Sequence, residues 1–387
     1  MRFVTWLSLL LSVPLAHAAP WREPNGFYVM QAVHNQNINN STLQSPALEG
    51  IHIRDEWQLL EPTRNTWDFN FYDTQIARAK DFGKKVTLGL YAGNNSPSWL
   101  GAPLDSGCPL PWSPGVEDRF LEAVNALGSR YNEETAITAV HISSVVTADS
   151  MEMFYPQGLK NRSDYTDDKV VAIWSRAIDA FADAFPDNTL VLDISMVPDS
   201  NGSVTYRVMN YARTRLWDRV NFIMCSLKAS TDPQAPHYLA VKNAHQADDS
   251  VRIGFEMVGP STDSVRFGGP FTTALALGQK TGATWYQIYQ ADISKIPLNF
   301  FSVPGDYDHN GVTNQSDYNL WRSSFGKDDM RADGNDDGKV DMADYVIWRS
   351  FVGSINNQTL NTRIIPEPSS LTLALLAILL LFSRRGR

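Results

Sequence analysis

Residues 71–90, FYDTQIARAKDFGKKVTLGL, decide the fold. The first twelve of them repeat apolar side chains at the 3.6-residue spacing of an amphipathic helix, and Gly83 follows where such a helix would end. The next run, Lys85–Leu90, is short and apolar, which predicts a strand. A helix followed at once by a strand is the unit of an alternating α/β structure, so we expect the same alternation on both sides of this stretch.

The alternation extends from about residue 21 to residue 293. Seven further runs have strand character, namely Phe27–Val33, Gly50–Ile53, Ile137–Ser143, Thr189–Met196, Phe222–Leu227, Val251–Met257 and Thr284–Tyr289. Helical spacing recurs between several of them, at Val116–Tyr131, Lys169–Phe185, Val204–Val220 and Phe271–Thr281. Eight strands alternating with helices predict a (β/α)8 barrel for residues 19–296. A doubly wound open sheet has the same alternation, but no G-x-G-x-x-G motif follows the first strand.

The composition limits the classes of function. The 387 residues carry a formal charge of -9, and 43% of them are hydrophobic, which is enough to bury a large core. The acidic balance, with no basic run in the middle of the chain, argues against a nucleic acid partner. The sequence contains neither G-x-S-x-G nor H-E-x-x-H, and its seven histidines are scattered. The 11 Trp and 14 Tyr suit a cleft in which aromatic rings stack on sugars.

The N-terminus has the pattern of a secretory signal peptide. Residues 1–18 combine Arg2, an apolar run and the small-residue sequence AHA at 16–18. An uncleaved membrane anchor is the alternative, although the apolar run is short for a membrane span. We therefore expect export through the Sec pathway.

The C-terminus has three parts in a defined order. Residues 366–368, PEP, precede an apolar run, Leu371–Phe382, and three arginines follow it. Twelve apolar residues make a marginal membrane helix, and the positive charge after them predicts a cytoplasmic tail. Residues 366–387 resemble the PEP-CTERM sorting signal of Gram-negative bacteria, while a plain membrane tail is the alternative. The resemblance implies membrane contact through this helix, processing by an exosortase, and a final place at the cell surface or outside the cell.

A repeat within residues 304–354 is the strongest local pattern. The hexapeptide DYDHNG starts at Asp306, and 27 residues later DGNDDG starts at Asp333; each is followed by the motif DYxxWR. The pattern D-x-[DN]-x-[DN]-G supplies hard oxygen ligands to Ca²⁺, with a backbone carbonyl at position 7 and a carboxylate at position 12. The predicted ligands are Asp306, Asp308, Asn310, Val312 and Asp317 in the first loop and Asp333, Asn335, Asp337, Lys339 and Asp344 in the second.

Two such loop–helix units in tandem resemble type I dockerin domains. That family folds on binding two Ca²⁺ and docks onto cohesin modules, so the resemblance implies a small all-α domain, two calcium ions and a cohesin-like partner. A calcium-stiffened spacer between the barrel and the sorting tail is the alternative. Trp321 and Trp348 are then either core residues of this domain or contacts to the partner. No cofactor is expected in the barrel.

Two glutamates follow strands of the expected barrel, where catalytic residues lie at the carboxyl ends. Glu256 ends the run VRIGFE of strand seven, and Glu152 lies in the loop after strand four. Retaining glycosidases use two carboxylates ~5–5.5 Å apart, one as acid/base and one as nucleophile. We predict Glu256 as the nucleophile and Glu152 as the acid, with Asp149 as the nearest substitute for the acid. Alternatively, both are ordinary loop acids and Glu256 is paired with Arg54.

An acid after strand four and a nucleophile on strand seven resemble clan A glycoside hydrolases. Residues 60–69, LEPTRNTWDF, and 96–100, SPSWL, look like stretches of several clan members. The resemblance implies that Arg54 keeps Glu256 ionised and that sugar faces stack on aromatic rings. The expected aromatic residues are Trp99, Tyr91 and Trp285. Many clan members carry Asn-Glu at the end of strand four, and this chain does not.

His34 and His141 can hydrogen-bond sugar hydroxyls or can be satisfied core residues. Cys108 and Cys225 allow either a disulfide or two buried thiols. Together these patterns predict an exported or surface-attached retaining glycoside hydrolase that acts on a poly- or oligosaccharide and carries a calcium-dependent docking module. The alternatives are a non-catalytic carbohydrate-binding barrel and a structural surface protein.

Overall fold

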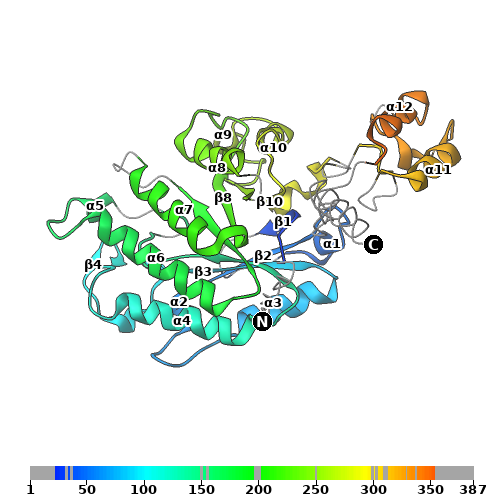
Figure 1. The fold of residues 1–387 in the computed structure, drawn as a ribbon. Coiled ribbons are helices and arrows are strands. Elements are labelled where there is room, and N and C mark those ends of the chain that lie inside the picture. The colour runs from blue at the N-terminus through cyan, green and yellow to red at the C-terminus, as the bar shows by residue number, and fades with distance from the viewer. Residues whose placement is uncertain are drawn as a thin grey trace, which may run out of the picture. The chain divides into compact units, whose positions relative to one another are not determined.

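The structure is a computed structural model that describes residues 22–30, 34, 38–148, 151–153, 157–195, 202–248, 251–297, 300, 304–307, 313–327, 329–335 and 338–353. The chain divides into two compact units, Met1–Phe300 and Phe301–Arg387. The first unit contains a closed parallel sheet with its surrounding helices, and the second contains the tandem repeat (Figure 1).

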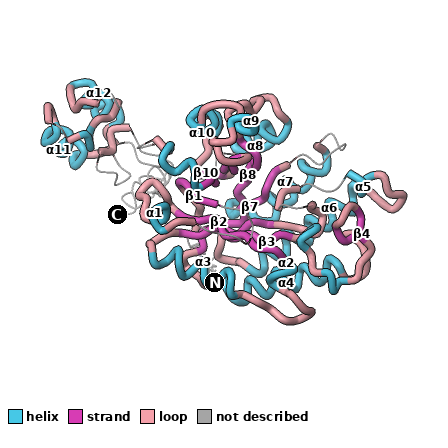
Figure 2. Tube along the Cα trace, turned by 180° about the vertical axis from the view of Figure 1, so that it is seen from behind, coloured by secondary structure: helices cyan, strands magenta, loops and turns pink. Residues whose placement is uncertain are grey.

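Eight parallel strands close into a barrel in the first unit. Each strand pairs with the next barrel strand along the chain, and the last pairs with the first, so the order is β1, β2, β3, β6, β7, β8, β9, β10. The bounds are Gly26–Met30 (β1), Gly50–Glu56 (β2), Lys85–Tyr91 (β3), Ile137–Ile142 (β6), Thr189–Ile194 (β7), Val220–Leu227 (β8), Arg252–Met257 (β9) and Trp285–Tyr289 (β10). Figure 2 shows these strands surrounded by the helices.

This arrangement confirms the predicted (β/α)8 barrel, and all eight predicted strands form. Their apolar runs are continuous because helices cover the outer face while side chains fill the interior. Every residue of β6 and of β7 is buried, for example. The barrel interior holds an apolar cluster with side chains from five strands, including β1 and β10, which close the barrel. Its members are Tyr28, Ala139, Val191, Ile223, Cys225 and Trp285.

The longer helices of this unit follow the strands as predicted. They are α3 (Asn70–Asp81), α4 (Val116–Tyr131), α6 (Asp167–Ala184), α7 (Ser203–Leu216), α8 (Pro236–Ala247) and α10 (Phe271–Gln279). The helix α8 is not among the predicted helices, because alanines make up half of its buried positions and give a weak apolar period. The shorter helices are α1 (Asn40–Leu43), α2 (Trp57–Leu60), α5 (Gln157–Lys160), α9 (Ser264–Phe267) and the 3₁₀ turns η1 (Gly93–Asn95), η2 (Ser98–Leu100), η3 (Trp217–Arg219) and η4 (Gln290–Lys295).

A two-stranded hairpin lies between the third barrel strand and α4. Its strands are β4 (Leu104–Asp105) and β5 (Cys108–Pro109), which pair antiparallel. The hairpin was not predicted, because two-residue strands are too short to produce an alternating pattern. It matters here because it packs against the loop that follows β6.

The second unit is built on the two predicted helices of the repeat, α11 (Gln315–Ser324) and α12 (Met342–Phe351), with the turn η5 (Met330–Ala332) between them. Both helices begin with a capping box, in which the N-cap side chain and the third helical residue exchange hydrogen bonds with each other's backbone N–H. Their shared core consists of Tyr307, Trp321, Ala332 and Val340, with Tyr318, Leu320, Tyr345 and Trp348 packed against it. Trp321 therefore belongs to the core of the repeat, and the partly buried Trp348 packs against it.

The indole N–H groups of these two tryptophans cross between the repeats. Trp321 Nε1 donates to the carbonyl of Asp341, 2.8 Å away, and Trp348 Nε1 donates to the carbonyl of Asn314, also at 2.8 Å. Asn314 and Asp341 are the N-caps of α11 and α12. Each repeat therefore holds the start of the other repeat's helix.

The predicted terminal signals, and with them the predicted membrane helix, lie at the two ends of the chain. Among the described residues, no helix is both long enough and apolar enough to span a membrane. The predicted signal peptide (1–18) and the predicted sorting signal (366–387), with its apolar run Leu371–Phe382, lie outside the described residues.

Candidate active site

Ionisable side chains gather towards the carboxyl ends of six barrel strands. Hydrogen bonds and close charges connect them into one group. The group consists of Arg54 on β2, Tyr91 on β3, Asp193 on β7, Cys225 on β8, Glu256 on β9 and Tyr289 on β10. This is the face on which (β/α)8 barrels carry their active sites.

Arg54 and Glu256 form the ion pair at the centre of this group. Arg54 Nη1 lies 3.4 Å from Glu256 Oε1 and donates to the hydroxyl of Tyr91 at 2.9 Å. The side chains of Arg54 and Glu256 are 7% and 14% exposed. Burial raises the pKa of Glu256; Arg54 opposes this increase, and the charge of Asp193 adds to it. Burial acts against the charge of Arg54, but Tyr91, Glu256 and Tyr289 raise its pKa overall.

Glu256 thus occupies the predicted place at the end of strand seven, with the predicted partner. The catalytic role and the structural role predicted for Arg54 both require this ion pair, so the contact agrees with either role. The guanidinium also places a permanent positive charge beside Glu256, which disfavours a metal ion at this position.

Glu152 lies in a loop segment that folds back onto the barrel. Met153 N donates to the carbonyl of Asp193 at 3.2 Å, and Met151 packs on Gly89, where any Cβ would clash with the Met151 sulfur. Glu152, between these two anchors, is half-buried. Burial raises the pKa of Cys225, and the charges of Asp193, Glu152 and Glu256 raise it further. The two predicted catalytic glutamates therefore act on the same thiol. Asp149, the substitute acid, lies outside the described residues.

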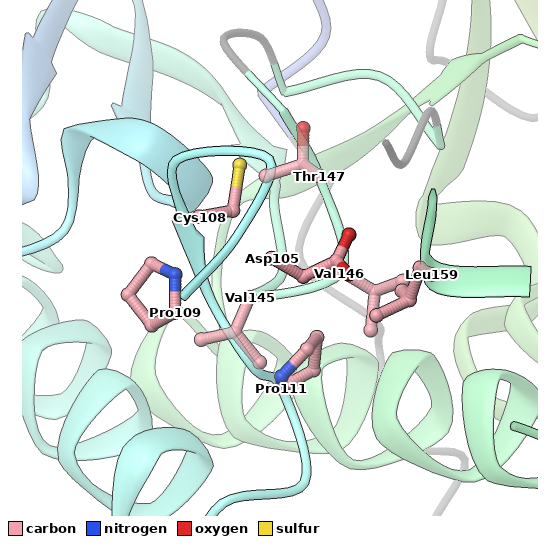
Figure 3. A pocket seen from close by; sticks show the side chains of 8 residues that line it. All are labelled: Asp105, Cys108, Pro109, Pro111, Val145, Val146, Thr147 and Leu159. Carbon is pink, nitrogen blue, oxygen red and sulfur yellow. The ribbon is translucent and has the colours of Figure 1, made fainter. Parts of the chain in front are cut away.

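The start of this loop is held by two neighbouring segments. Asn94 N donates to the carbonyl of Ala148 at 2.8 Å, and Gly93 adopts a positive φ of 61° at a place where a Cβ would clash with that carbonyl. Cys108 of the β4–β5 hairpin lies beside Thr147 at a cavity of ≈ 10 Å³ (Figure 3). A cavity of this size holds at most one water molecule, so the hairpin supports the loop and does not form a substrate cleft.

Asp193 was missed by sequence reasoning and lies within the group. His141 Nδ1 is 2.6 Å from its Oδ1, and Cys225 Sγ is 3.8 Å from its Oδ2. Ligand atoms of Asp193, Cys225 and Glu256 all lie within 4.8 Å of one another. The available signal was a lone charged residue near the end of the apolar run Thr189–Met196. Cys108 and Cys225 are both buried thiols, with no disulfide between them.

His141 does not reach a substrate position as predicted. It is wholly buried, and both ring nitrogens have partners within the protein: Nδ1 meets Asp193, and Nε2 lies 2.9 Å from the amide nitrogen of Gln287. The reason is that His141 points into the barrel, where β7 and β10 supply those partners. His34 is also paired, with its Nδ1 2.6 Å from Asp55 Oδ1.

The predicted aromatic residues occupy three different environments. Trp285 is a correction: it is the first residue of β10, so its buried indole lies in the barrel core on Gly254 and not at the mouth. Tyr289, at the other end of β10, takes the place at the mouth. Tyr91 is buried and uses its hydroxyl to hold Arg54. Trp99 is half-buried on η2, and its Nε1 donates to the carbonyl of Glu61 at 2.8 Å.

Two predicted calcium ligands of the second loop accept hydrogen bonds from the backbone of that loop. Asp344 Oδ1 accepts from Gly334 N at 2.7 Å, and Asp333 Oδ2 accepts from Gly338 N at 2.8 Å. Gly338 has a positive φ of 81°, as the sharp turn at position 6 requires. The carboxylates at positions 1 and 12 are buried in both loops: Asp306, Asp317, Asp333 and Asp344.

Buried carboxylates on a compact turn fit a hard cation such as Ca²⁺, which six to eight oxygen atoms coordinate. Of the remaining predicted ligands, Asn335 and Lys339 are described and exposed. The rest lie outside the described residues: Asp308, Asn310, Val312 and Asp337. The calcium site therefore stays a prediction, with six of its ten predicted ligands described.

No model of a known protein family matches the chain. Among solved structures, the catalytic domain of β-amylase from Paenibacillus polymyxa is similar at 14% identity, over 72% of this chain and 94% of that chain, with a TM-score of 0.49. Xylanase B from Clostridium stercorarium F9 is similar at 11% identity, over 68% and 85%, with a TM-score of 0.44. A glycosylated endo-β-1,4-xylanase from Gloeophyllum trabeum is similar at 11% identity, over 69% and 85%, with a TM-score of 0.46. The chemistry of the site is therefore inferred from its own residues.

Proposed function

We propose that the chain is an exported or surface-attached retaining glycoside hydrolase that acts on a poly- or oligosaccharide. The observation that carries this proposal is the buried carboxylate of Glu256 at the end of the seventh barrel strand, 3.4 Å from Arg54 and within 4.8 Å of the Asp193 carboxylate. A nucleophile of this kind needs a neighbouring cation to stay ionised and a second carboxyl group to exchange protons. Arg54 supplies the first, and Glu152 is the proposed second.

The reaction has two steps with balanced proton transfer. Glu152, protonated in its half-buried loop, gives its proton to the glycosidic oxygen while Glu256 attacks the anomeric carbon, so the C–O bond to the leaving group breaks and a glycosyl-enzyme forms. Glu152, now a carboxylate, takes a proton from water, whose oxygen attacks the same carbon and releases Glu256. Two inversions give net retention.

In this proposal, the segments outside the barrel determine where the enzyme is placed. The repeat at residues 304–354 binds two Ca²⁺ and docks onto a cohesin-like partner. The signal peptide directs export, and the 366–387 segment is handled by an exosortase-type machinery after transient contact with the membrane. These assignments rest on the sequence patterns and on the buried carboxylates of the repeat.

The decisive experiment removes the proposed nucleophile. Glu256→Ala should abolish hydrolysis of a panel of aryl glycosides while the barrel keeps a cooperative thermal unfolding transition. Added azide should restore turnover of the activated substrate and give a glycosyl azide of inverted configuration, because the small anion enters the space of the missing carboxylate. Glu122→Ala, a partly exposed glutamate on α4, is the matched control and should retain full activity. Unchanged turnover in Glu256→Ala would remove the assignment.

The proposed acid has its own signature. Glu152→Gln should lose roughly 10²–10⁴-fold on substrates with poor leaving groups, because general acid catalysis contributes about that much. It should lose little on dinitrophenyl glycosides, whose leaving group needs no proton. An equal loss on both substrate types would exclude Glu152 as the acid.

A carbohydrate-binding barrel without catalysis is the second candidate, and one observation favours it. The fourth strand ends at Ile142 and is followed by two buried serines, where many similar enzymes have Asn-Glu. Ser143 Oγ donates to the carbonyl of Leu90 at 2.6 Å, so it faces the neighbouring strand. Retention of insoluble polysaccharides without release of reducing ends would support this function over hydrolysis.

A further inference from the structure

Asp193 is held by a hydrogen-bonded chain that begins on the opposite side of the barrel. Gln287 on β10 presents its amide nitrogen to His141 Nε2 at 2.9 Å, and His141 Nδ1 lies 2.6 Å from Asp193 Oδ1. An amide N–H can only donate, so His141 accepts at Nε2 and donates from Nδ1. With the amide oriented in this way, the chain of hydrogen bonds runs from Gln287 through His141 to Asp193, and it fixes the position of Asp193 Oδ1.

The second oxygen of Asp193 also meets a donor. Cys225 Sγ lies 3.8 Å from Oδ2, and the raised pKa of this buried thiol keeps it in the S–H form that can donate. Asp193 is 1% exposed and so has little access to water. Both oxygens therefore accept from groups that the barrel fixes in place, and the negative charge of Asp193 is locked in one position.

That fixed charge faces Glu256. Oxygen atoms of the two carboxylates lie within 4.8 Å of each other, in a site that excludes most water. Two neighbours therefore act on the ionisation of Glu256 in opposite directions: Arg54 favours the charged form, and Asp193 disfavours it. The titratable groups that act on Glu256, or on the groups in contact with it, come from seven segments: Arg54, Tyr91, His141, Glu152, Asp193, Cys225 and Tyr289.

We propose that Asp193 is a positioning residue of the reaction, a carboxylate held in place by His141 that acts through Glu256 and stabilises the positive charge developing on the sugar ring. This inference rests on the proposed hydrolase function. A like charge beside the nucleophile keeps Glu256 more basic and therefore more nucleophilic than Arg54 alone would leave it. The same negative charge stabilises an oxocarbenium-like transition state and does little for the neutral substrate, so it lowers the barrier without tightening binding.

Asp193→Asn tests this proposal because it removes the charge and keeps the shape. The expected result is a fall of roughly 100-fold in kcat at nearly unchanged KM, the size of one charge acting at this range. The acidic limb of the kcat/KM profile should move to lower pH, because Glu256 loses the like charge that opposes its ionisation. Asp292→Asn is the matched control, since Asp292 is an equally buried carboxylate on η4 that contacts Ser261 and Lys295, and it should leave the acidic limb in place.

A second pair of variants separates the charge from packing. His141→Asn retains a side-chain N–H near the position of Nδ1 and should keep the wild-type acidic limb. His141→Leu removes the donor that fixes the position of Asp193 Oδ1 and should move the limb in the direction of Asp193→Asn. A structural role alone would make both variants lose activity with an unchanged acidic limb, and that result would overturn the proposal.

Direct titration of Glu256 makes the outcome independent of catalysis. The carboxyl signal of Glu256, assigned by its loss in Glu256→Gln in carbon-13 glutamate-labelled protein, should titrate at lower pH in Asp193→Asn than in the wild type. An unchanged titration in folded protein overturns the proposal. If Asp193→Asn shifts the titration of Glu256 but the wild-type protein hydrolyses no glycoside, the coupling between the two carboxylates is retained and the hydrolase function is rejected.

Discussion

The barrel mouth and the tandem repeat at residues 304–354 both bury carboxylates, but they balance the charge in different ways. In the mouth, side chains from neighbouring strands face the acids: Arg54 is 3.4 Å from Glu256, and His141 is 2.6 Å from Asp193. In the repeat, the fully buried Asp344 accepts hydrogen bonds from the backbone N–H groups of Gly334, Asn335 and Asp341. A backbone N–H carries a partial charge, whereas a guanidinium carries a whole one.

The difference predicts two modes of folding. The barrel completes its charge balance from its own sequence, so it should fold without a ligand. The repeat gathers carboxylates on two short loops, and under our proposal a cation from solution holds them together. Three experiments test this contrast, and the largest effect is expected in the repeat.

Removal of calcium should unfold the repeat and spare the barrel. Since a ligand at a thousandfold excess over its Kd contributes about 4 kcal/mol, EGTA should abolish the separate unfolding transition of residues 304–354. The readout is the fluorescence of Trp321 and Trp348, with the double variant Trp321→Phe/Trp348→Phe as the control that assigns the signal. Aryl glycoside hydrolysis by the barrel should continue in EGTA. A repeat that melts at the same temperature with and without calcium would contradict the contrast.

Removal of the Arg54 guanidinium should leave the carboxylates of the barrel mouth without their own balancing charge, as removal of calcium would leave those of the repeat. Arg54→Met leaves Glu256 buried beside Asp193 with no guanidinium, so the pKa of Glu256 should rise further and the acidic limb of kcat/KM should move to higher pH. Breaking a buried ion pair from one side costs about 3–5 kcal/mol, so the midpoint of chemical denaturation should fall clearly. Arg54→Lys keeps the charge but lacks the planar guanidinium whose Nη1 reaches both Tyr91 and Glu256, and it should show a smaller effect in both measurements.

The smallest effect concerns the pH dependence of stability. Burial raises the pKa of Glu256 in the folded protein above its unfolded value, so the folded state holds the proton more tightly. Stability is therefore lost as pH rises from the unfolded pKa of Glu256 through its folded pKa. Glu256→Gln does not titrate, so its melting temperature relative to the wild type should increase from pH 4 to pH 7. Glu122→Gln, at an exposed site, should show a constant difference over the same range.

The barrel was predictable because its strands are continuous apolar runs, and their order follows from connection rules alone. Glu256 was predictable for the same reason, as the last residue of a run. Asp193 was not, because its role depends on lateral neighbours: the register places His141 opposite Val191, two residues before Asp193 in the next strand. Trp285 was misplaced because a sequence pattern shows where a strand lies more readily than whether a given side chain lies at the mouth of the barrel or in its core.

The crossed indole bonds of the repeat have a consequence for how such a module can arise and be divided. Trp321 serves the N-cap of α12 and Trp348 serves the N-cap of α11, and both donor and acceptor positions are 27 residues apart. A single loop–helix unit would therefore lack the donor that holds its own cap and would offer an indole to a partner that is not there. Two identical copies of such a unit would supply this exchange between separate chains, so a homodimer of single repeats would satisfy the same two caps that the tandem repeat satisfies within one polypeptide.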